Sequence, residues 1–332
     1  MDKAKWTSLC RRRNFLALVL GFGLLYGLMS SGFISMQYQG IIITIGIYVL
    51  LAASLNLTTG VLGELVLGHA GFMSIGAYTA ALFTLHMDLP GLVEFPLALL
   101  LGGALAAVFG VLIGIPALRL RGDYLAIVTL GFGEIIRVVI QNLSFTGGGR
   151  GLYGIDEYTT FPWVFWIAAL SVAVMYAMIG TRQGRAILSL RENEIAAEAV
   201  GVPGTRYKVL AFTISSFFAG VAGGLYAHYI TVLDPATFDF MKSIEILVMV
   251  VLGGMGSFTG SVLAAVVLTL LPELLRDLAD YRMLIYSVVL VLMMILRPQG
   301  LLGKREFSLS RLWERLTAML KKPVPAGGKG EE

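Results

Sequence analysis

Apolar segments long enough to cross a lipid bilayer follow one another along almost the whole chain. A spanning helix needs about 20 apolar residues. Windows of this kind lie at residues 15–31, 40–57, 61–85, 92–118, 123–142, 161–180, 208–230, 243–275 and 281–296. The apolar–polar alternation of a transmembrane β-strand is absent from them. The pattern therefore predicts an all-α, polytopic transmembrane helix bundle and not a barrel.

The window at 243–275 is too long for one ordinary crossing, and glycines interrupt it at positions 253, 254 and 256. Two helices around a glycine turn would raise the total to about ten spans. The string LGGMGSFTG at this turn also resembles LGHAGFMSIG in the third window. This similarity indicates an inverted repeat, in which glycine-interrupted segments occupy corresponding points of two halves; chance similarity of two glycine-rich segments is the alternative.

Charge sets the expected orientation. Residues 1–14, the loops at 119–123 and 182–208, and the tail at 301–332, with Arg297 just before it, hold 20 of the 25 basic residues, which places them in the cytoplasm. We then expect the first window to be an uncleaved helix, and residues 15–300 to form the transmembrane domain. We expect the tail to be disordered beyond about residue 320. The segment after residue 230, which includes Asp234, Asp239 and Lys242, is predicted to be external.

Composition supports the same class. Hydrophobic residues make up 57% of the 332 residues and charged residues 14%, and the mean hydropathy is +0.82. A soluble domain needs a far more polar surface. The net charge of +4 does not indicate a nucleic-acid partner, because the basic residues lie at span ends. The single cysteine, Cys10, can form no internal disulfide.

The loop at 182–208 is the only long polar interruption in the middle of the chain. Ser189 and Glu192 have the spacing of a capping box, Asn193 is a second candidate cap, and Gly201 is a stop signal. These signals predict a short helix over 193–200 that has too few large apolar residues to form a core and needs a partner surface. The residues predicted to make that contact are Glu194, Ile195, Ala196, Ala197, Glu198 and Gly201.

The third window contains ionisable residues among small ones. Glu64 and His69 lie beside Gly68 and Gly71, and ionisable groups inside a membrane are functional candidates by default. The predicted translocation path comprises Glu64, Gly68, His69, Gly71, Gly253, Gly254 and Gly256. In the alternative interpretation, Glu64 lies at the cytoplasmic headgroups and His69 makes one interhelical hydrogen bond. No metal site is predicted, since the other histidines lie far away in sequence.

Two further patterns bear on chemistry. Glu134 and Arg137 have the i, i+3 spacing of an intrahelical ion pair, which is expected to stabilise the bundle and not to contact a solute. The phosphate-binding pattern G-x-x-x-x-G-K-[S/T] does not occur, so the chain is not expected to hydrolyse ATP itself. No nucleophile and base share a span, which argues against an enzyme.

Five strings in order resemble the second permease subunit of bacterial branched-chain amino acid ABC importers. They are GHAGFMSIGAYTAAL, RGDYLAIVTLGFGEIIR, TGGGRGLYGI, RENEIAAEAVGVPGTRYK and SIEILVMVVLGGMGSFTGSVLAA. The fourth string is similar to the cytoplasmic EAA loop of such permeases, whose short coupling helix docks on the ATPase. Ala196, Ala197 and Gly201 match that motif, whereas Ile195 occupies the position of its glutamate and Glu194 precedes it.

The resemblance implies an assembly in the bacterial inner membrane. Its partners would be a second, homologous permease, two cytoplasmic ATPase subunits and an external solute-binding protein that delivers leucine, isoleucine or valine. It implies no bound cofactor. Two alternatives stay open: a permease of the same family for urea or short amides, and an ion-coupled secondary transporter that uses Glu64, His69 and Glu134 as carriers.

Overall fold

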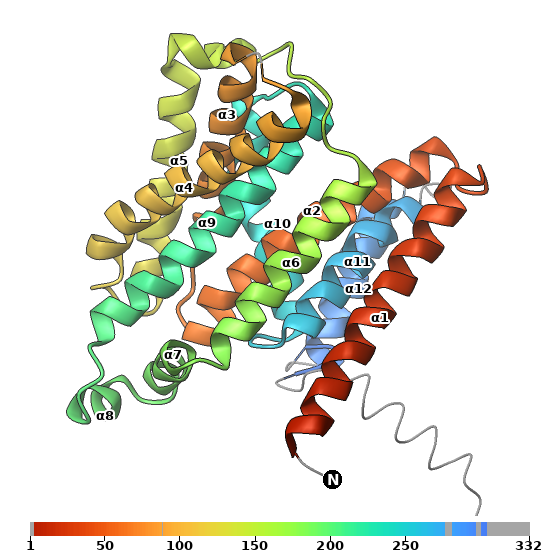
Figure 1. Ribbon diagram of the computed structural model, residues 1–332. Helices are drawn as coiled ribbons and strands as arrows, with labels where there is room; N and C mark the ends of the chain where they lie inside the picture. The colour runs from red at the N-terminus through yellow and green to blue at the C-terminus, as the bar shows by residue number, and fades with distance from the viewer. Residues whose placement is uncertain (1–2, 88, 276–280, 297–299, 304–332) are drawn as a thin grey trace, which may run out of the picture. The chain divides into compact units, whose positions relative to one another are not determined.

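A computed structural model describes residues 3–87, 89–275, 281–296 and 300–303. This part of the chain is helical apart from loops and one isolated antiparallel bridge between Leu152 and Leu233, which confirms the predicted all-α class (Figure 1). The elements are α1 (Lys3–Ser30), α2 (Met36–Asn56), the π-helix η1 (Leu57–Leu62), α3 (His69–His86), α4 (Gly91–Ala117), α5 (Asp123–Asn142), the 3₁₀-helices η2 (Ser144–Thr146) and η3 (Gly148–Arg150), α6 (Phe161–Ile179), α7 (Arg182–Glu192), α8 (Glu194–Ala199), α9 (Gly204–Ile230), the 3₁₀-helix η4 (Pro235–Phe238), α10 (Phe240–Gly253), α11 (Phe258–Leu274) and α12 (Arg282–Leu296).

The chain divides into two compact units. Met1–Phe33 and Glu306–Glu332 form one, of which α1 is the described helix, and Ile34–Arg305 forms the other. Helix α1 begins at Lys3, well before the predicted start of the first apolar window. The predicted cytoplasmic tail lies outside the described residues from 304 onward. The sections below concern the second unit.

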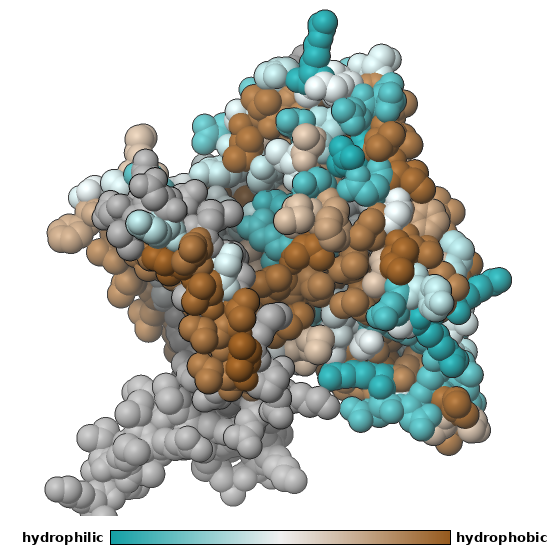
Figure 2. Space-filling view, turned by 180° about the vertical axis from the view of Figure 1, so that it is seen from behind, coloured by the Kyte–Doolittle hydropathy of each residue, from teal (hydrophilic) through white to brown (hydrophobic). Residues whose placement is uncertain are grey.

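Several helices have the length and apolarity of membrane spans. Within the described residues, α2 with η1, α4, α6 and α9 meet both criteria, and each agrees with a predicted window to within a few residues. Apolar side chains cover broad areas of the face in Figure 2, and some hydrophilic side chains interrupt them. The fold is therefore that of a polytopic membrane protein, and the total of ten crossings stays a prediction.

The third predicted window is not one continuous helix. The π-helix η1 ends at Gly63, whose φ of +87° only glycine adopts at low cost, and residues 63–68 are non-helical before α3 begins at His69. A similar break separates α9 from α10, where residues 231–239 contain only the short helix η4. The predicted glycine turn is confirmed, since α10 ends at Gly253 and α11 begins at Phe258.

The N-termini of the two helices that follow these breaks meet inside the bundle. The Ala70 amide of α3 donates to Ser243 Oγ of α10 at 3.0 Å. From this point the helices run in opposite directions. Tyr78 of α3 reaches the segment after α9, where its hydroxyl donates to the Leu233 carbonyl. At the other end, the Gly256 amide beyond α10 donates to Asn56 Oδ1 at the end of α2.

The packing of the longer helices follows the same symmetry. Helix α4 packs along α9, as α11 packs along α2. The structure thus relates α2–α4 to α9–α11, in opposite orientations, which supports the expected inverted repeat. The corresponding segments differ from the two glycine-rich strings: the counterpart of residues 63–68 is 231–239, and the Gly253–Gly256 turn lies one helix later.

Glycines bring α3, α4 and α9 into backbone contact. A Cβ added to Gly76 would lie 2.1 Å from the Gly220 carbonyl oxygen, and one added to Gly102 would lie 2.7 Å from the Gly76 carbonyl oxygen. Such close approach needs residues without side chains at the crossing, and small residues are typical of helix interfaces in membranes. These three helices therefore form a tightly packed block.

Candidate functional site

The polar loop folds into two helices, of which the sequence predicted only the second. Helix α7 covers Arg182–Glu192, and Thr181 Oγ1 accepts from the Gly184 amide as its N-cap. The proposed Ser189–Glu192 capping box is wrong, because Ser189 lies inside α7 and its hydroxyl donates to the Ala186 carbonyl. Few apolar positions in α7 face inward, which explains why its polar sequence does not reveal the helix.

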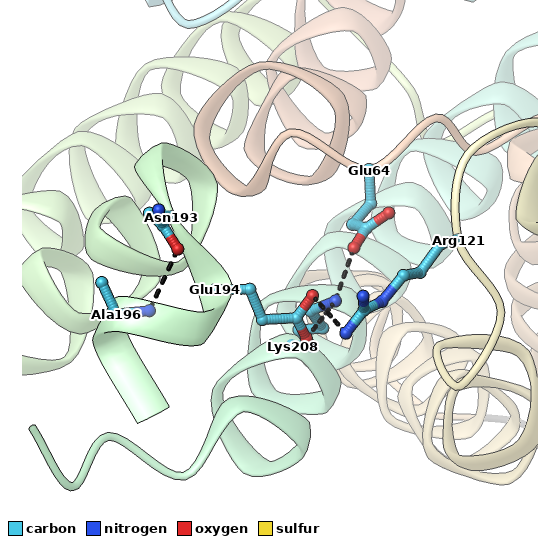
Figure 3. Close-up of polar contacts among 6 residues, drawn as sticks. All are labelled: Glu64, Arg121, Asn193, Glu194, Ala196 and Lys208. Carbon is cyan, nitrogen blue, oxygen red and sulfur yellow. Dashed lines mark hydrogen bonds and ion pairs between the residues drawn. The ribbon is translucent and has the colours of Figure 1, made fainter. Parts of the chain in front are cut away.

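Helix α8 is capped at both ends. Asn193 Oδ1 accepts from the Ala196 amide at 3.0 Å (Figure 3), which confirms Asn193 as the N-cap. At the other end the amides of Gly201 and Val202 donate to the carbonyls of Glu198 and Ala197, the two bonds of a Schellman motif. Gly201 has a φ of +90°, as predicted for a left-handed cap. An isolated helix of six residues is unstable, so these caps hold α8 in shape.

The two faces of α8 differ. Ala197 is buried and Glu194 points inward, whereas Ile195 is 74% exposed and Val200 is 81% exposed. The Ala197 side chain packs within the chain, and its contact with a partner stays a prediction. Ile195, Ala196, Glu198 and Gly201 are exposed and available to a partner.

An ion network joins the inner face of α8 to the break before α3. Lys208 Nζ lies 2.7 Å from Glu64 Oε1 and 2.8 Å from Glu194 Oε1, and its side chain is only 5% exposed. Arg121 lies 3.3 Å from the other Glu194 oxygen (Figure 3). One lysine of α9 thus connects α8 with the segment that leads into α3. Sequence reasoning counted Lys208 only as an orientation signal, although a lysine at the start of an apolar helix needs a counter-ion.

Helix α7 contacts two of the chain breaks through one residue. A Cβ on Gly63 would lie 3.0 Å from Arg191 Cγ, and a Cβ on Gly256 would lie 2.8 Å from an Arg191 guanidinium nitrogen. The Arg191 side chain therefore lies beside both the end of η1 and the turn between α10 and α11. The α7–α8 loop touches both halves of the repeat.

The structure does not gather the predicted path residues at one place. Glu64 belongs to the ion network, and His69 Nε2 lies 2.8 Å from Ser54 Oγ of α2, as the interhelical alternative proposes. Gly68 and Gly71 pack against Thr129 and Gly133 of α5. The remaining path glycines lie elsewhere: Gly253 against Gly260, Gly254 against Gly300, and Gly256 against Gly60 and Arg191.

A shallow cleft lies where α3, α5 and α10 meet. Gly71, Glu134, Asp239 and Ser243 are among its lining residues. The predicted ion pair is present, with Arg137 Nε 2.8 Å from Glu134 Oε2, and it is partly buried. Asp239 Oδ1 accepts from the Lys242 amide, so the polar groups of the cleft have partners within the chain. No cluster of metal ligands occurs among the residues the structure describes.

Opposed broken helices inside a polytopic bundle, and a capped loop helix tied to one of the breaks, define a membrane transport permease. The family model described as the permease component of the branched-chain amino acid transport system matches residues 37–297. The chain belongs to this family, as the resemblance indicated. It is a multi-pass inner-membrane permease subunit and not an enzyme.

Individual relatives agree with this assignment. The high-affinity branched-chain amino acid transport system permease proteins LivM of Salmonella typhimurium and Escherichia coli are each 42% identical over 291 residues, covering 77% of this chain and 68% of the relative. The permease protein LivH of Escherichia coli is 25% identical over 304 residues, covering 82% of this chain and 96% of LivH. No solved structure matches.

Proposed function

We propose that this chain forms half of the translocation path of an ABC importer for branched-chain amino acids, in which separate ATPase subunits bind α8. The observation that carries the proposal is the two-sided character of α8. Its inner face is tied to the chain through Glu194, and its outer face exposes Ile195 and Val200. Exposed apolar side chains on a rigidly capped helix suit a docking site for another protein.

The contacts of the loop suggest how motion would pass from the ATPase to the spans. A displacement of α8 acts on Lys208 through Glu194, and Lys208 acts on the segment at 63–68 through Glu64. Arg191 provides a second connection, to the turn at Gly256 in the other half. Both connections end at helix breaks, where backbone rearrangement is easier than within a continuous helix.

The remaining subunits are proposed from the family. The similarity to both LivM and LivH supports a second, homologous permease as a partner. Two ATPase subunits and an external solute-binding protein are proposed from the family resemblance. The 42% identity to LivM, against 24% to the ribose import permease protein RbsC of Haemophilus influenzae, favours amino acids over other solutes. The glycines at 68, 71, 253, 254 and 256, with His69, stay predictions as path residues.

The test changes the exposed face of α8. An Ile195→Asp/Val200→Asp variant should insert in the membrane and pair with the second permease, because both side chains lie outside the packed core. It should lose the ATPase subunits on co-purification and lose ATP-driven leucine uptake in reconstituted vesicles. Tyr153→Asp, also at an exposed residue, in the loop between η3 and α6, is the matched control and should keep both. Retained ATPase binding and uptake in the α8 variant would refute the proposal, and uptake driven by an ion gradient without ATPase would favour a secondary transporter.

A further inference from the structure

A charged group of side chains lies between α2 and α10, away from the α7–α8 loop. It consists of Tyr48 on α2 and of Lys242 and Glu245 on α10, and we call these residues the midmembrane triad. Lys242 Nζ lies 3.0 Å from Glu245 Oε2 and also donates to the Tyr48 hydroxyl, which itself donates to Glu245 Oε2 at 3.3 Å. Lys242 lies in the first turn of α10, so these contacts connect the start of α10 with the middle of α2; its place in an external segment stays a prediction.

The position of Tyr48 sets the depth of the triad. The span that contains it runs from Met36 to Leu62, and Tyr48 lies twelve residues from one end and fourteen from the other. At 1.5 Å per residue these distances are about 18 and 21 Å. Tyr48, and with it Lys242 and Glu245, is near the middle of the span.

The triad is open to its surroundings. The Glu245 side chain is 40% exposed and the Lys242 side chain 18%. Within the described part of the chain both polar contacts of Glu245 use Oε2, which leaves Oε1 for a donor from outside. Ionisable groups at this depth face water-filled paths or protein partners and not lipid, because hydrocarbon disfavours charge strongly. The exposed side of the triad therefore faces either the solute path or another subunit.

The triad and the cleft at α3 and α5 each contain an ion-paired carboxylate, and the triad also contains a bridging hydroxyl. In the cleft, Glu134 pairs with Arg137, Asp239 caps α10, and Ser243 accepts from Ala70. The triad presents one cation, one anion and an open carboxylate oxygen within one helical turn, as Glu134 and Arg137 also do, and adds the Tyr48 hydroxyl that bridges its two charges. A zwitterion carries the same two charges in complementary order.

We propose that the midmembrane triad binds the head group of an amino acid during translocation. The solute carboxylate pairs with Lys242 and its ammonium group pairs with Glu245, so that every charge keeps a partner while the ion pair opens. The Tyr48 hydroxyl, bonded to both, holds the two side chains on one side of α10. This inference rests on the proposed function for the nature of the solute, and its first test does not depend on ATP-driven transport.

The first test measures access of water and solute to the triad. Met241 lies one turn before Glu245 on α10 and is 64% exposed, so a cysteine there reports on the same face without altering the triad. In the assembled complex with Cys10→Ser, we expect a charged thiol reagent to label Met241→Cys and leucine to slow the labelling at least tenfold. The protection should disappear when Glu245→Gln is added.

Leu105→Cys is the matched control, since Leu105 lies at the middle of α4 and is exposed on an apolar face. It should not react. Labelling of Met241→Cys no faster than that of the Leu105 control would show that lipid or a second subunit covers the triad, and would overturn the proposal. Protection by leucine in a complex without ATP-driven uptake would support the triad and refute the proposed function.

The second test separates binding from structural pairing. Lys242→Met and Glu245→Gln should each lower leucine uptake at least tenfold while the complex keeps its ATPase subunits. If the pair only stabilised the bundle, the double variant Lys242→Met/Glu245→Gln would restore uptake, because no charge would be left without a partner. We expect the double variant to assemble and remain inactive; uptake at the level of the unaltered protein would overturn the proposal.

Discussion

Replacement of Lys208 by methionine should free α8 from its contact with α9 and with the segment at 63–68. The change removes the cation that Glu64 and Glu194 share while keeping the length and apolar character of the side chain. Breaking a buried ion pair by removing one partner costs about 3–5 kcal/mol. The two carboxylates retain some exposure, 15% and 23%, and Arg121 still contacts Glu194, so a value of about 2–3 kcal/mol is expected here.

Hydrogen exchange measures this cost directly. Exchange of the hydrogen-bonded amides of Ala196, Ala197, Val200, Gly201 and Val202 requires α8 to open, and a loss of about 2–3 kcal/mol raises the rate about 30- to 150-fold. Arg121→Gln is the control within the same network. Because the Arg121 side chain is 71% exposed, its pair contributes no more than about 1 kcal/mol, and exchange should rise no more than about fivefold.

A rescue variant tests the cause. Adding Glu64→Gln and Glu194→Gln to Lys208→Met leaves no unpaired charge in the network, and exchange should fall back to within about tenfold of the unaltered protein. If Lys208→Met exchanged like Arg121→Gln, the buried network would not hold α8, and the proposed connection from α8 to the segment at 63–68 would be refuted.

Two further predictions concern glycines. Gly76→Ala should lower the thermal unfolding temperature in detergent, because its Cβ would lie 2.1 Å from the Gly220 carbonyl oxygen. Gly131→Ala is the control and should have little effect, because its added Cβ would have no neighbour within 4 Å. Equal unfolding temperatures of the two variants would contradict the proposed crossing. Gly201→Val should speed exchange of the α8 amides, since a β-branched residue at a φ of +90° costs about 1 kcal/mol or more, and Gly201→Asn should have a smaller effect. Equal exchange in the two Gly201 variants would argue against backbone strain at this cap.

Local signals account for what the sequence revealed. The apolar window at 123–142 coincides with α5, and Asn193 and Gly201 bound α8 as predicted, because hydrophobic length and capping act within a few residues. The glycine turn after α10 follows from the same kind of signal. Each of these features depends on neighbours in the chain and not on the tertiary fold.

The missed features depend on distant contacts. The glycines at 63 and 68 permit a break in the helix, but packing beside α5 and Arg191 fixes where the break before α3 lies. Lys242 and Tyr48 are 194 residues apart, so the sequence pattern does not reveal their contact. The link between Glu64 and Lys208 spans 144 residues and was missed for the same reason.

The glycine crossing of α3 and α9 also has a mechanical meaning. Sixteen residues, or about 24 Å of helix, separate Gly204 at the start of α9 from Gly220 at the crossing. Backbone contact leaves no side chain there that could change rotamer and absorb a small movement. Helix α9 can therefore tilt as a rigid body about the contact at Gly220. A tilt of about 5° displaces the end beside α8 by about 2 Å over that length of helix.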